Sequence, residues 1–281
     1  MGEGTGASDI DRAVKAKHRA MWALGDYSAV ADQLIPALGR TLVDACGIRA
    51  GTRVLDVAAG TGNAAIPAAM AGAEVVASDL TPELLEVGRL IAGKLGVELE
   101  WREADAEALP FGDGVFDTVM SCVGVMFAPH HQACADEMLR VCRPGGTIGL
   151  LNWTPEGLIG RMFATMKPYA PPPPPGAQPP PLWGDEDHVR ALLGERVAAV
   201  EARRGTVRVD RFTTPEEFRD YFKKNYGPTI AVYRNIADDP ERVADLDREL
   251  AALAREYASP ADDGSGMAMD WEYLLLTARR S

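Results

Sequence analysis

One stretch of the chain, from Arg53 to Gly62, restricts the fold more than any other. The apolar run Arg53–Val57 leads directly into the small residues of the sequence AAGTG at positions 58–62. Glycine lets the backbone turn tightly and approach a ligand closely. A strand that ends in such a turn also presents free N–H groups at the start of the following helix. The stretch therefore predicts a strand–turn–helix unit with a ligand at the turn.

The same alternation of strands and helices continues to residue 152. Further strand patterns lie at residues 74–79, 98–102, 116–121 and 147–152, and helix patterns separate them at residues 63–70, 82–93 and 129–142. Strands that alternate with helices form a mostly parallel sheet with right-handed crossovers. The sequence therefore predicts an α/β fold with a doubly wound, Rossmann-like sheet.

The expected sheet occupies the middle of the 281-residue chain and divides it into four segments. Residues 1–50 are expected to form a helical cap, residues 51–153 the sheet core, residues 154–269 a proline-rich connection with a further cap, and residues 270–281 a closing strand. Within the third segment, residues 206–212 alternate like a strand, and Thr214 with Pro215 predicts a helix start.

A run of prolines at residues 171–175 interrupts the pattern after the expected core. Such a run is extended and cannot join the interior of a sheet. We interpret residues 168–181 as a stiff surface connection, and a recognition ligand or a lid is the open alternative.

Charge and composition exclude several classes of partner. The formal net charge of −12 repels phosphate backbones, so we expect no nucleic-acid partner. Apolar runs are shorter than the roughly 18 residues of a membrane span, so we expect no membrane partner. The four cysteines form no CxxC pair, and the first residues lack a signal-peptide pattern, which together predict a cytoplasmic protein with reduced thiols. A homodimer is compatible with the sequence, which leaves the oligomeric state open.

Two carboxylates sharpen the identity of the ligand. Asp79, at the end of the second strand, suits two ribose hydroxyls, but enzymes that use NAD share this feature. Asp56 lies inside the first strand just before the turn, where an anion would repel a dinucleotide pyrophosphate. It suits a ligand with a cationic amino group and a sulfonium. A structural role, in which Asp56 accepts N–H bonds of the loop, stays open.

The motifs in this order resemble those of the class I S-adenosylmethionine-dependent methyltransferases, particularly the ubiquinone/menaquinone-biosynthesis type (the type 11 group). They are VLDVAAGTG at residues 54–62, SDLTPELL at 78–85, ADAEALPF at 104–111, FD at 116–117 and RVCRPGG at 140–146. The resemblance covers residues 51–152 and implies S-adenosylmethionine as cofactor. It also implies a seven-stranded sheet whose last strand, at residues 270–278, is antiparallel.

The resemblance also implies roles for residues at matching positions. Asp56, Ala58, Gly60 and Gly62 would surround the methionine part of the cofactor. Asp79 would bind the ribose and Leu80 would contact adenine, while Asp105 would accept the adenine amino group beside Ala106. Ser121 and Val123, in the stretch 121–124, would lie near the reacting methyl group. The segment 143–146 is expected to be a structural turn.

The methyl acceptor is expected to be a small molecule, apolar or aromatic, that reacts by in-line displacement. Candidate residues of its pocket are aromatic, although core packing is the alternative for each: Trp22, Tyr27, Phe127, Trp153 and Tyr226. Candidate catalytic residues are Tyr27 and His131, because a histidine at a helix N-terminus stays neutral and can act as a base. His18 is expected on the surface, and no cluster has the spacing of metal ligands.

Two other functions compete with methyl transfer. A nicotinamide oxidoreductase could use a similar sheet, but Asp56 and the motif around Asp105 argue against it. A relative that binds the cofactor without catalysis, as a regulatory module, also fits the cofactor motifs. The sequence leaves the acceptor atom open among oxygen, nitrogen, carbon and sulfur.

Overall fold

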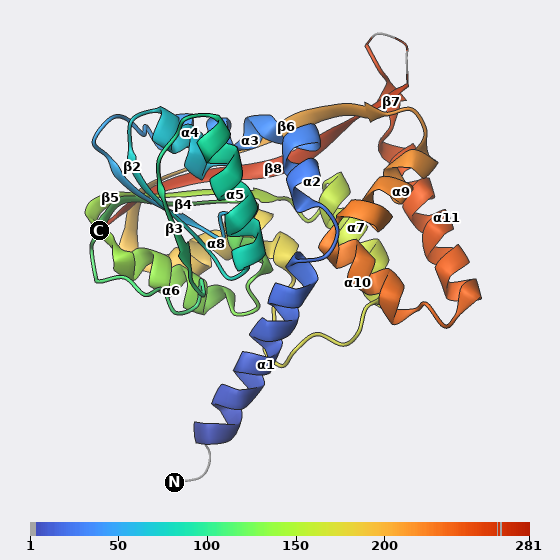
Figure 1. Ribbon diagram of the computed structural model, residues 1–281, viewed down its shortest axis with the longest axis horizontal. Coiled ribbons are helices and arrows are strands. Elements are labelled where there is room, and N and C mark those ends of the chain that lie inside the picture. Colours follow the sequence, from blue (N-terminus) through green and yellow to red (C-terminus); the bar gives the residue numbers. More distant parts are fainter. Residues whose placement is uncertain (1–3, 263, 265) are drawn as a thin grey trace.

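The core of the protein is one mixed β-sheet, seen edge-on in the computed structural model, which describes residues 4–262, 264 and 266–281 (Figure 1). The strands are β1 (Arg53–Val57), β2 (Glu74–Asp79), β3 (Glu100–Glu103), β4 (Phe116–Cys122), β5 (Cys142–Trp153), β6 (Val197–Phe212), β7 (Ser259–Pro260) and β8 (Met267–Arg280). Their order is β3-β2-β1-β4-β5-β8-β6, and the short β7 pairs with β8. Strands β1 to β5 are parallel, whereas β8 runs antiparallel to both β5 and β6.

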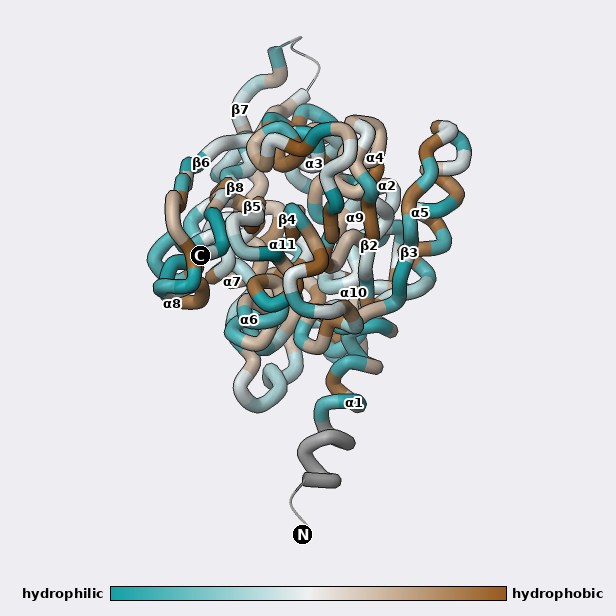
Figure 2. The backbone as a smooth tube through the Cα atoms, turned by 90° about the vertical axis from the view of Figure 1, so that its left-hand side faces the viewer, coloured by the Kyte–Doolittle hydropathy of each residue, from teal (hydrophilic) through white to brown (hydrophobic). Residues whose placement is uncertain are grey.

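Helices cover both faces of the sheet. One face carries α3 (Pro36–Ala45), α4 (Ala65–Met70) and α5 (Pro82–Lys94), and the other carries α6 (His131–Val141) and α8 (Glu186–Leu193) (Figure 1). The parallel strands β1, β2 and β4 are buried on both sides, which explains their continuous apolar runs, whereas the edge strand β3 is largely exposed. Figure 2 shows the apolar strands in the middle of the molecule and more hydrophilic segments around them.

A group of helices lies beyond the carboxyl ends of β4 and β5 and forms a cap over that end of the sheet. It contains α7 (Leu158–Met166), α9 (Pro215–Asn225), α10 (Gly227–Asn235) and α11 (Pro240–Tyr257) (Figure 1). The helix α1 (Gly4–Trp22) extends from this region away from the body of the protein, and α2 (Tyr27–Leu34) follows it (Figures 1 and 2). The cap therefore combines helices that precede β1 with helices that lie between β5 and β8 in the sequence.

The α/β sheet and its antiparallel last strand are confirmed, but two local expectations were wrong. The strand expected at residues 206–212 begins already at Val197. This strand, β6, pairs along β8, so the segment after the core contributes the edge strand of the sheet. Residues 143–146, expected as a turn, form the irregular start of β5, where Gly145 has a φ of +73°. Helix α7 lies in a stretch, residues 158–166, for which the sequence indicated no individual helix.

The proline run at residues 171–175 lies between the short helical turns Lys167–Tyr169 and Pro180–Gly184 and is largely exposed. No helix among the described residues is both long and apolar enough to cross a membrane. The four cysteines are free thiols.

Candidate active site

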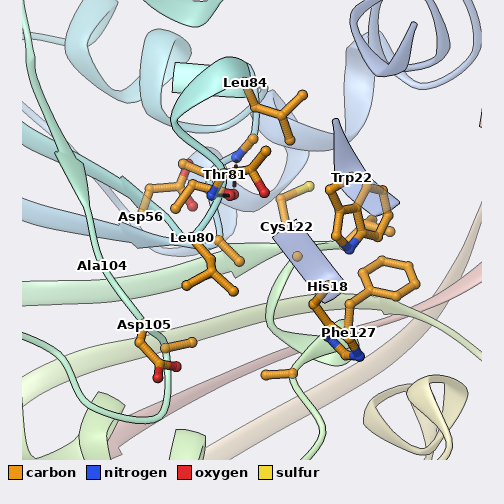
Figure 3. Close-up of a pocket in the computed structure, with 18 of the residues that line it drawn as sticks. His18, Trp22, Asp56, Leu80, Thr81, Leu84, Ala104, Asp105, Cys122 and Phe127 are labelled. Atoms are coloured by element: carbon orange, nitrogen blue, oxygen red, sulfur yellow. Dashed lines mark hydrogen bonds between the residues drawn. The ribbon is translucent and has the colours of Figure 1, made fainter. Parts of the chain in front are cut away.

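A deep cavity lies at the carboxyl ends of β1, β2 and β4, where parallel sheets of this kind bind ligands. Its empty volume is about 850 Å³, open solvent at the mouth included. We call it the cofactor cavity. The turn after β1, the end of β2, the segment after β3 and the segment after β4 supply its floor, and α1 supplies a wall. Figure 3 shows His18, Trp22 and Phe127 grouped on one side of this cavity, opposite Asp56 and Leu80.

The turn after β1 is held in a left-handed backbone conformation. Gly60 and Gly62 have φ values of +55° and +89°, which only glycine adopts without strain. Ala58 shares this conformation with a φ of +54°, although an alanine is strained there. A strained turn at the floor of a cavity is typical of a ligand-binding site.

Asp56 is the least satisfied polar group of the cavity. Its side chain is only 1% exposed, and neither carboxyl oxygen has a hydrogen-bond partner among the residues that the structure describes. Burial raises the pKa of Asp56 to about 8, because a carboxylate loses its hydration there, and the nearby backbone N–H of Ala65 offsets this only in part. A buried carboxyl group without a partner implies that a ligand supplies the missing donors.

Asp79 ties the end of β2 to the glycine turn. Its two carboxyl oxygens accept hydrogen bonds of 2.8 Å from the backbone N–H groups of Gly60 and Thr81. Burial still raises the pKa of this carboxyl group, against those two hydrogen bonds. Because each carboxylate oxygen can accept more than one hydrogen bond, Asp79 retains acceptor capacity toward the cavity.

The far end of the cavity carries a small ion-pair network. Lys15 of α1 pairs with Asp105 and lies 3.2 Å from a carboxyl oxygen of Glu107. The second oxygen of Asp105 accepts the backbone N–H of Glu107 at 2.9 Å. Lys15, His18 and Trp22 all line the cavity, because residues three and four positions apart share one face of a helix. The face of α1 that carries these three side chains therefore forms the outer wall of the site.

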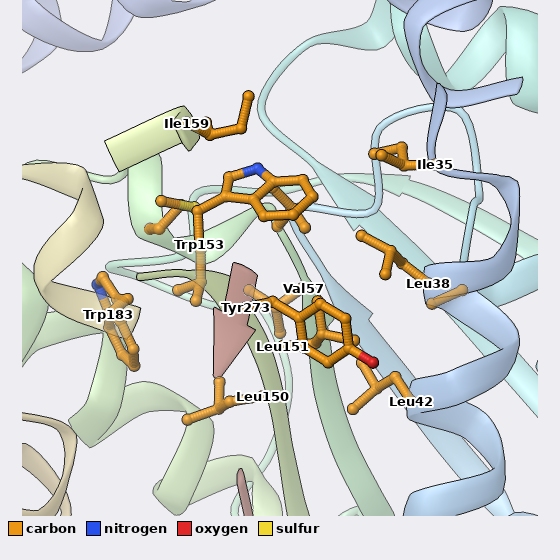
Figure 4. Packing of buried hydrophobic residues seen from close by; sticks show 14 of the residues in the cluster. Ile35, Leu38, Leu42, Val57, Leu150, Leu151, Trp153, Ile159, Trp183 and Tyr273 are labelled. Atoms are coloured by element: carbon orange, nitrogen blue, oxygen red, sulfur yellow. The ribbon is translucent and has the colours of Figure 1, made fainter. Parts of the chain in front are cut away.

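A second, smaller cavity adjoins the first and is lined by apolar and aromatic side chains. We call it the inner cavity, and its empty volume is about 320 Å³, space open to solvent included. It is lined by Tyr27, Val30, Ile35, Val123, Phe127, Trp153, Ile159, Phe222, Tyr226 and Trp271. Figure 4 shows Trp153 between Ile35 and Ile159 in this region. Tyr27, Val123 and Phe127 line both cavities, so the two spaces share a common wall.

Trp22 joins the aromatic side chains around this common wall. Its ring centroid lies 5.4 Å from that of Tyr27, 4.6 Å from that of Phe127 and 5.7 Å from that of Tyr226. All three pairs meet edge to face, a favourable arrangement for aromatic rings. Val123 has a φ of +53°, which is a strained conformation for a β-branched residue. Backbone strain thus occurs both in the glycine turn and at the shared wall.

Most of the residues predicted for cofactor binding lie around the cofactor cavity. Those that line it are Asp56, Ala58, Gly60, Asp79, Leu80, Asp105, Ala106 and Val123. Gly62 and Ser121 do not line the cofactor cavity and lie behind the residues that do. Gly62 faces the ring of Trp101, where a Cβ would come within 2.8 Å. The hydroxyl of Ser121 donates to the carbonyl of Val57 at 2.6 Å, which links β4 to β1.

The aromatic candidates for the acceptor pocket also lie at these cavities. Trp22 lines the cofactor cavity, Tyr27 and Phe127 line both, and Trp153 and Tyr226 line the inner one. His131, the candidate base, is not among the lining residues. It is buried against Trp183, and its Nδ1 lies 3.0 Å from Nε2 of His188. The structure thus separates His131 from the chemistry, because the first turn of α6 points this side chain toward α8.

Sequence reasoning missed several lining residues. His18 was expected on the surface and Lys15 received no role, but their spacing to Trp22 was a signal that all three share one face. Thr81 and Leu84 line the cofactor cavity beside Leu80. Trp271 reaches the inner cavity from the closing strand β8. No local pattern marks Trp271, because its position depends on the pairing of β8 with β6 and on the packing of its ring against that of Trp153.

Comparison with known proteins decides the family. Residues 54–146 match a family described as a methyltransferase domain. Two uncharacterized proteins of Mycobacterium tuberculosis strain H37Rv are similar over nearly the whole length. One is 56% identical over 94% of both chains, and the other is 53% identical over 96% of both. A demethylmenaquinone methyltransferase of Thermus thermophilus is 37% identical over 44% of this chain and 60% of its own.

The chain belongs to the class I S-adenosylmethionine-dependent methyltransferases.

Solved structures of low sequence identity share the fold of this methyltransferase. The YcgJ protein from Bacillus subtilis has a TM-score of 0.58 at 17% identity and covers 86% of this chain and 98% of its own. A putative methyltransferase from Bacillus halodurans has a TM-score of 0.54 at 22% identity, with 86% and 97% covered. A geranyl diphosphate methyltransferase in complex with S-adenosylmethionine has a TM-score of 0.52 at 18% identity, with 88% and 85% covered.

The cofactor cavity of the methyltransferase fits S-adenosylmethionine by its donor and acceptor set. The unpartnered carboxyl group of Asp56 suits the cationic amino group of the methionine part, and Asp79 suits a ribose diol. Leu80 and Leu84 offer apolar contacts for adenine. No cationic side chain touches Asp56 among the described residues, so a bound cation would not compete with an existing ion pair.

Proposed function

We propose that the methyltransferase methylates an uncharged, apolar or aromatic small molecule that binds in the inner cavity. One observation carries this proposal. The inner cavity shares Tyr27, Val123 and Phe127 with the cofactor cavity, and no charged residue lines it in the part of the chain that the structure describes. An acceptor bound there lies directly across the shared wall from the cofactor.

The lining of the inner cavity argues against charged acceptors. Moving a charged group from water into an apolar space costs far more free energy than apolar contacts there provide, unless an opposite charge compensates it. Aromatic side chains instead offer large contact areas to a flat or apolar molecule. The hydroxyls of Tyr27 and Tyr226 are the most polar side-chain groups in the lining, and they can hold one hydroxyl or carbonyl group of an acceptor.

When bound, S-adenosylmethionine supplies an activated methyl group for in-line displacement, so positioning of the acceptor supplies much of the rate. We propose that Tyr27 performs this positioning. Its ring packs over the glycine turn, where its Cε1 would lie 3.2 Å from a Cβ on Gly60. Burial raises the pKa of Tyr27, and the nearby carboxyl groups raise it further, so its hydroxyl stays protonated at neutral pH. Tyr27 therefore acts as a hydrogen-bond donor rather than as a base.

Both flanking segments contribute to this acceptor site. Val30 and Ile35 belong to residues 1–50, and Ile159, Phe222 and Tyr226 belong to residues 154–269. We propose that these two segments form one acceptor cap over the core at residues 51–153. The net charge of −12 further supports a small-molecule acceptor over a nucleic acid, and the four free cysteines support a cytoplasmic protein.

The experiment separates the acceptor site from the cofactor site. Transfer of a labelled methyl group is measured with a panel of neutral phenols, quinols and other apolar molecules, and with a matched panel of charged amines and acids. We expect transfer to members of the neutral panel only. Ile159→Trp fills the inner cavity and should abolish transfer while calorimetry shows unchanged cofactor binding. Leu90→Trp, at a side chain that is 67% exposed on α5, is the matched control. Transfer to charged acceptors, or full activity of Ile159→Trp, would refute the proposal.

A further inference from the structure

The wall that α1 contributes to the cofactor cavity is joined to the wall of the inner cavity through the backbone. Two segments make this junction. Residues 21–26 comprise the end of α1 and the turn that follows it, and residues 225–227 lie where α9 ends and α10 begins. The N–H of Asp26 donates to the carbonyl of Asn225 at 3.0 Å, and Gly25 forms an antiparallel bridge with Tyr226. We call this junction the glycine clip.

Two glycines permit this close approach. A Cβ on Gly25 would lie 2.4 Å from the carbonyl oxygen of Asn225, and a Cβ on Gly227 would lie 2.3 Å from the carbonyl oxygen of Met21. Real Cβ atoms do not come so close to a backbone oxygen, so a side chain at either position would push the two segments apart. Gly25 also has a φ of +71°, which disfavours other residues. The clip therefore requires glycine both at position 25 and at position 227.

The clip connects residues that belong to different sites. Trp22 lines the cofactor cavity but not the inner cavity, whereas Tyr226 lines the inner cavity but not the cofactor cavity. Tyr226 lies between the two clipped residues Asn225 and Gly227, and its ring contacts that of Trp22. Any movement of the end of α1 relative to the core thus carries Tyr226 with it.

The rest of α1 is attached to the core mainly through polar contacts. Arg19 lies 3.0 Å from Glu103 and 3.7 Å from Glu83, and these side chains are 41%, 54% and 56% exposed. Exposed ion pairs of this kind contribute little to stability. A cofactor that fills the space beside Lys15, His18 and Trp22 adds contacts to this helix face, and binding shifts the population toward the position of α1 that makes those contacts.

We propose that the glycine clip couples the two cavities, so that cofactor binding fixes Tyr226 and completes the inner cavity before the acceptor binds. Gly25 and Gly227 are positioning residues in this scheme, since neither lines a cavity. The inference rests on the proposed function in one respect, the assignment of the inner cavity to the acceptor. In this scheme the reaction is ordered, and the cofactor binds before the acceptor.

The test uses hydrogen exchange of the full chain with S-adenosylhomocysteine as the probe. In the wild-type protein we expect slower exchange, by about tenfold or more, at residues 15–27 and also at residues 226–230, which do not line the cofactor cavity. Gly227→Ala and Gly25→Ala should retain the protection of α1 near Lys15 and His18 and lose the protection at residues 226–230. Their affinity for the probe should stay within about threefold of wild type, because neither glycine touches the cofactor cavity.

The control variant is Gly93→Ala, a helical glycine whose Cβ would meet open space, and it should behave as wild type. If S-adenosylhomocysteine leaves exchange at residues 226–230 of the wild-type protein unchanged, this result alone would overturn the coupling. Ligand-dependent protection that persists there in both folded clip variants would overturn the role of the glycines. The measurement needs no acceptor, so its failure is distinct from a failure of the methyl-transfer assay above.

Discussion

The backbone N–H of Gly60 donates a 2.8 Å hydrogen bond to Asp79, which links the glycine turn after β1 to the end of β2. The same carboxyl group accepts the N–H of Thr81 at the start of α5. Asp79 therefore shapes the floor of the cofactor cavity in addition to facing it. We therefore expect a change at this position to affect both the glycine turn and the ribose contact that we propose for this carboxylate.

We expect Asp79→Ala to weaken binding of S-adenosylmethionine by about tenfold or more, because it removes a charged hydrogen-bond acceptor and releases Gly60. Isothermal titration calorimetry measures the change. Asp44→Ala, at an exposed carboxylate on α3 that pairs with Arg40, is the control and should bind as wild type. An unchanged affinity of Asp79→Ala would contradict the assignment of this carboxylate to the cofactor.

A second prediction concerns the proton that Asp56 carries. The pKa of its buried carboxyl group is about 8, so the group is largely protonated at pH 7 in the ligand-free protein. A cationic ligand favours the ionised form, and binding at pH 7 should release roughly one proton. Calorimetry in buffers of different ionisation enthalpy reports this number directly.

Asp56→Asn is the matched variant, because it keeps the shape and removes the titration. We expect it to abolish proton release and to weaken binding. The same variant should raise the melting temperature of the ligand-free protein, on the order of 5 °C, since it removes a costly buried acid without a partner. Proton release that persists in Asp56→Asn would assign the titrating group elsewhere.

The core of the site was predictable from sequence because its signals are local. The turn at residues 58–62 and the carboxylates Asp56 and Asp79 lie at the ends of adjacent strands, so the order of the parallel strands alone brings them together. The outer wall was only partly predictable. Trp22 was expected near the ligand, whereas Lys15 and His18 on the same face of α1 resembled an ordinary charged helix surface.

The inner cavity was harder to predict because it depends on contacts between distant segments. Trp271 reaches it from β8, where it pairs with Val207 of β6, and Phe222 reaches it through the packing of α9. His131 illustrates the opposite error. Its place at the start of a helix after β4 fitted a base, but the side-chain direction, which packing with Trp183 and His188 sets, points away from the cavities.

A third prediction follows from the close approach of the two loops that flank the cofactor cavity. A Cβ on Gly124, after β4, would lie 2.1 Å from the carbonyl oxygen of Ala58 in the glycine turn. Gly124→Ala must therefore displace one loop or the other. We expect a loss of stability of about 1 to 3 kcal/mol and at least about tenfold weaker cofactor binding. Denaturant unfolding and calorimetry check the two effects.

The control for this variant is Gly93→Ala, in the middle of an exposed helix turn with no atom near the added methyl group. Alanine favours a helix over glycine by roughly 0.5 to 1 kcal/mol, so this variant should be slightly more stable than wild type and bind the cofactor normally. Wild-type stability and affinity in Gly124→Ala would show that the loops separate without cost, contrary to the prediction.

The contact between the buried His131 and the half-buried His188 leads to a fourth prediction, which concerns stability in mild acid. Burial and the neighbouring His188 together lower the pKa of His131 to about 4, whereas an unfolded chain has its usual histidine pKa of about 6.5. The unfolded state thus binds more protons between these values. The contribution of neutral His131 to the free energy of unfolding is fully present above pH 6.5 and is lost as the pH falls toward 4.

We expect the free energy of unfolding to fall by about 2 kcal/mol between pH 7 and pH 4.5 through this group alone. Carboxyl groups titrate in the same range, so the measurement compares wild type with His131→Phe, which keeps an aromatic ring and removes the titration. The difference between the two proteins should shrink or reverse in favour of His131→Phe as the pH falls. A difference that is constant with pH would mean that His131 has the same pKa in the folded and the unfolded state, which would contradict the prediction.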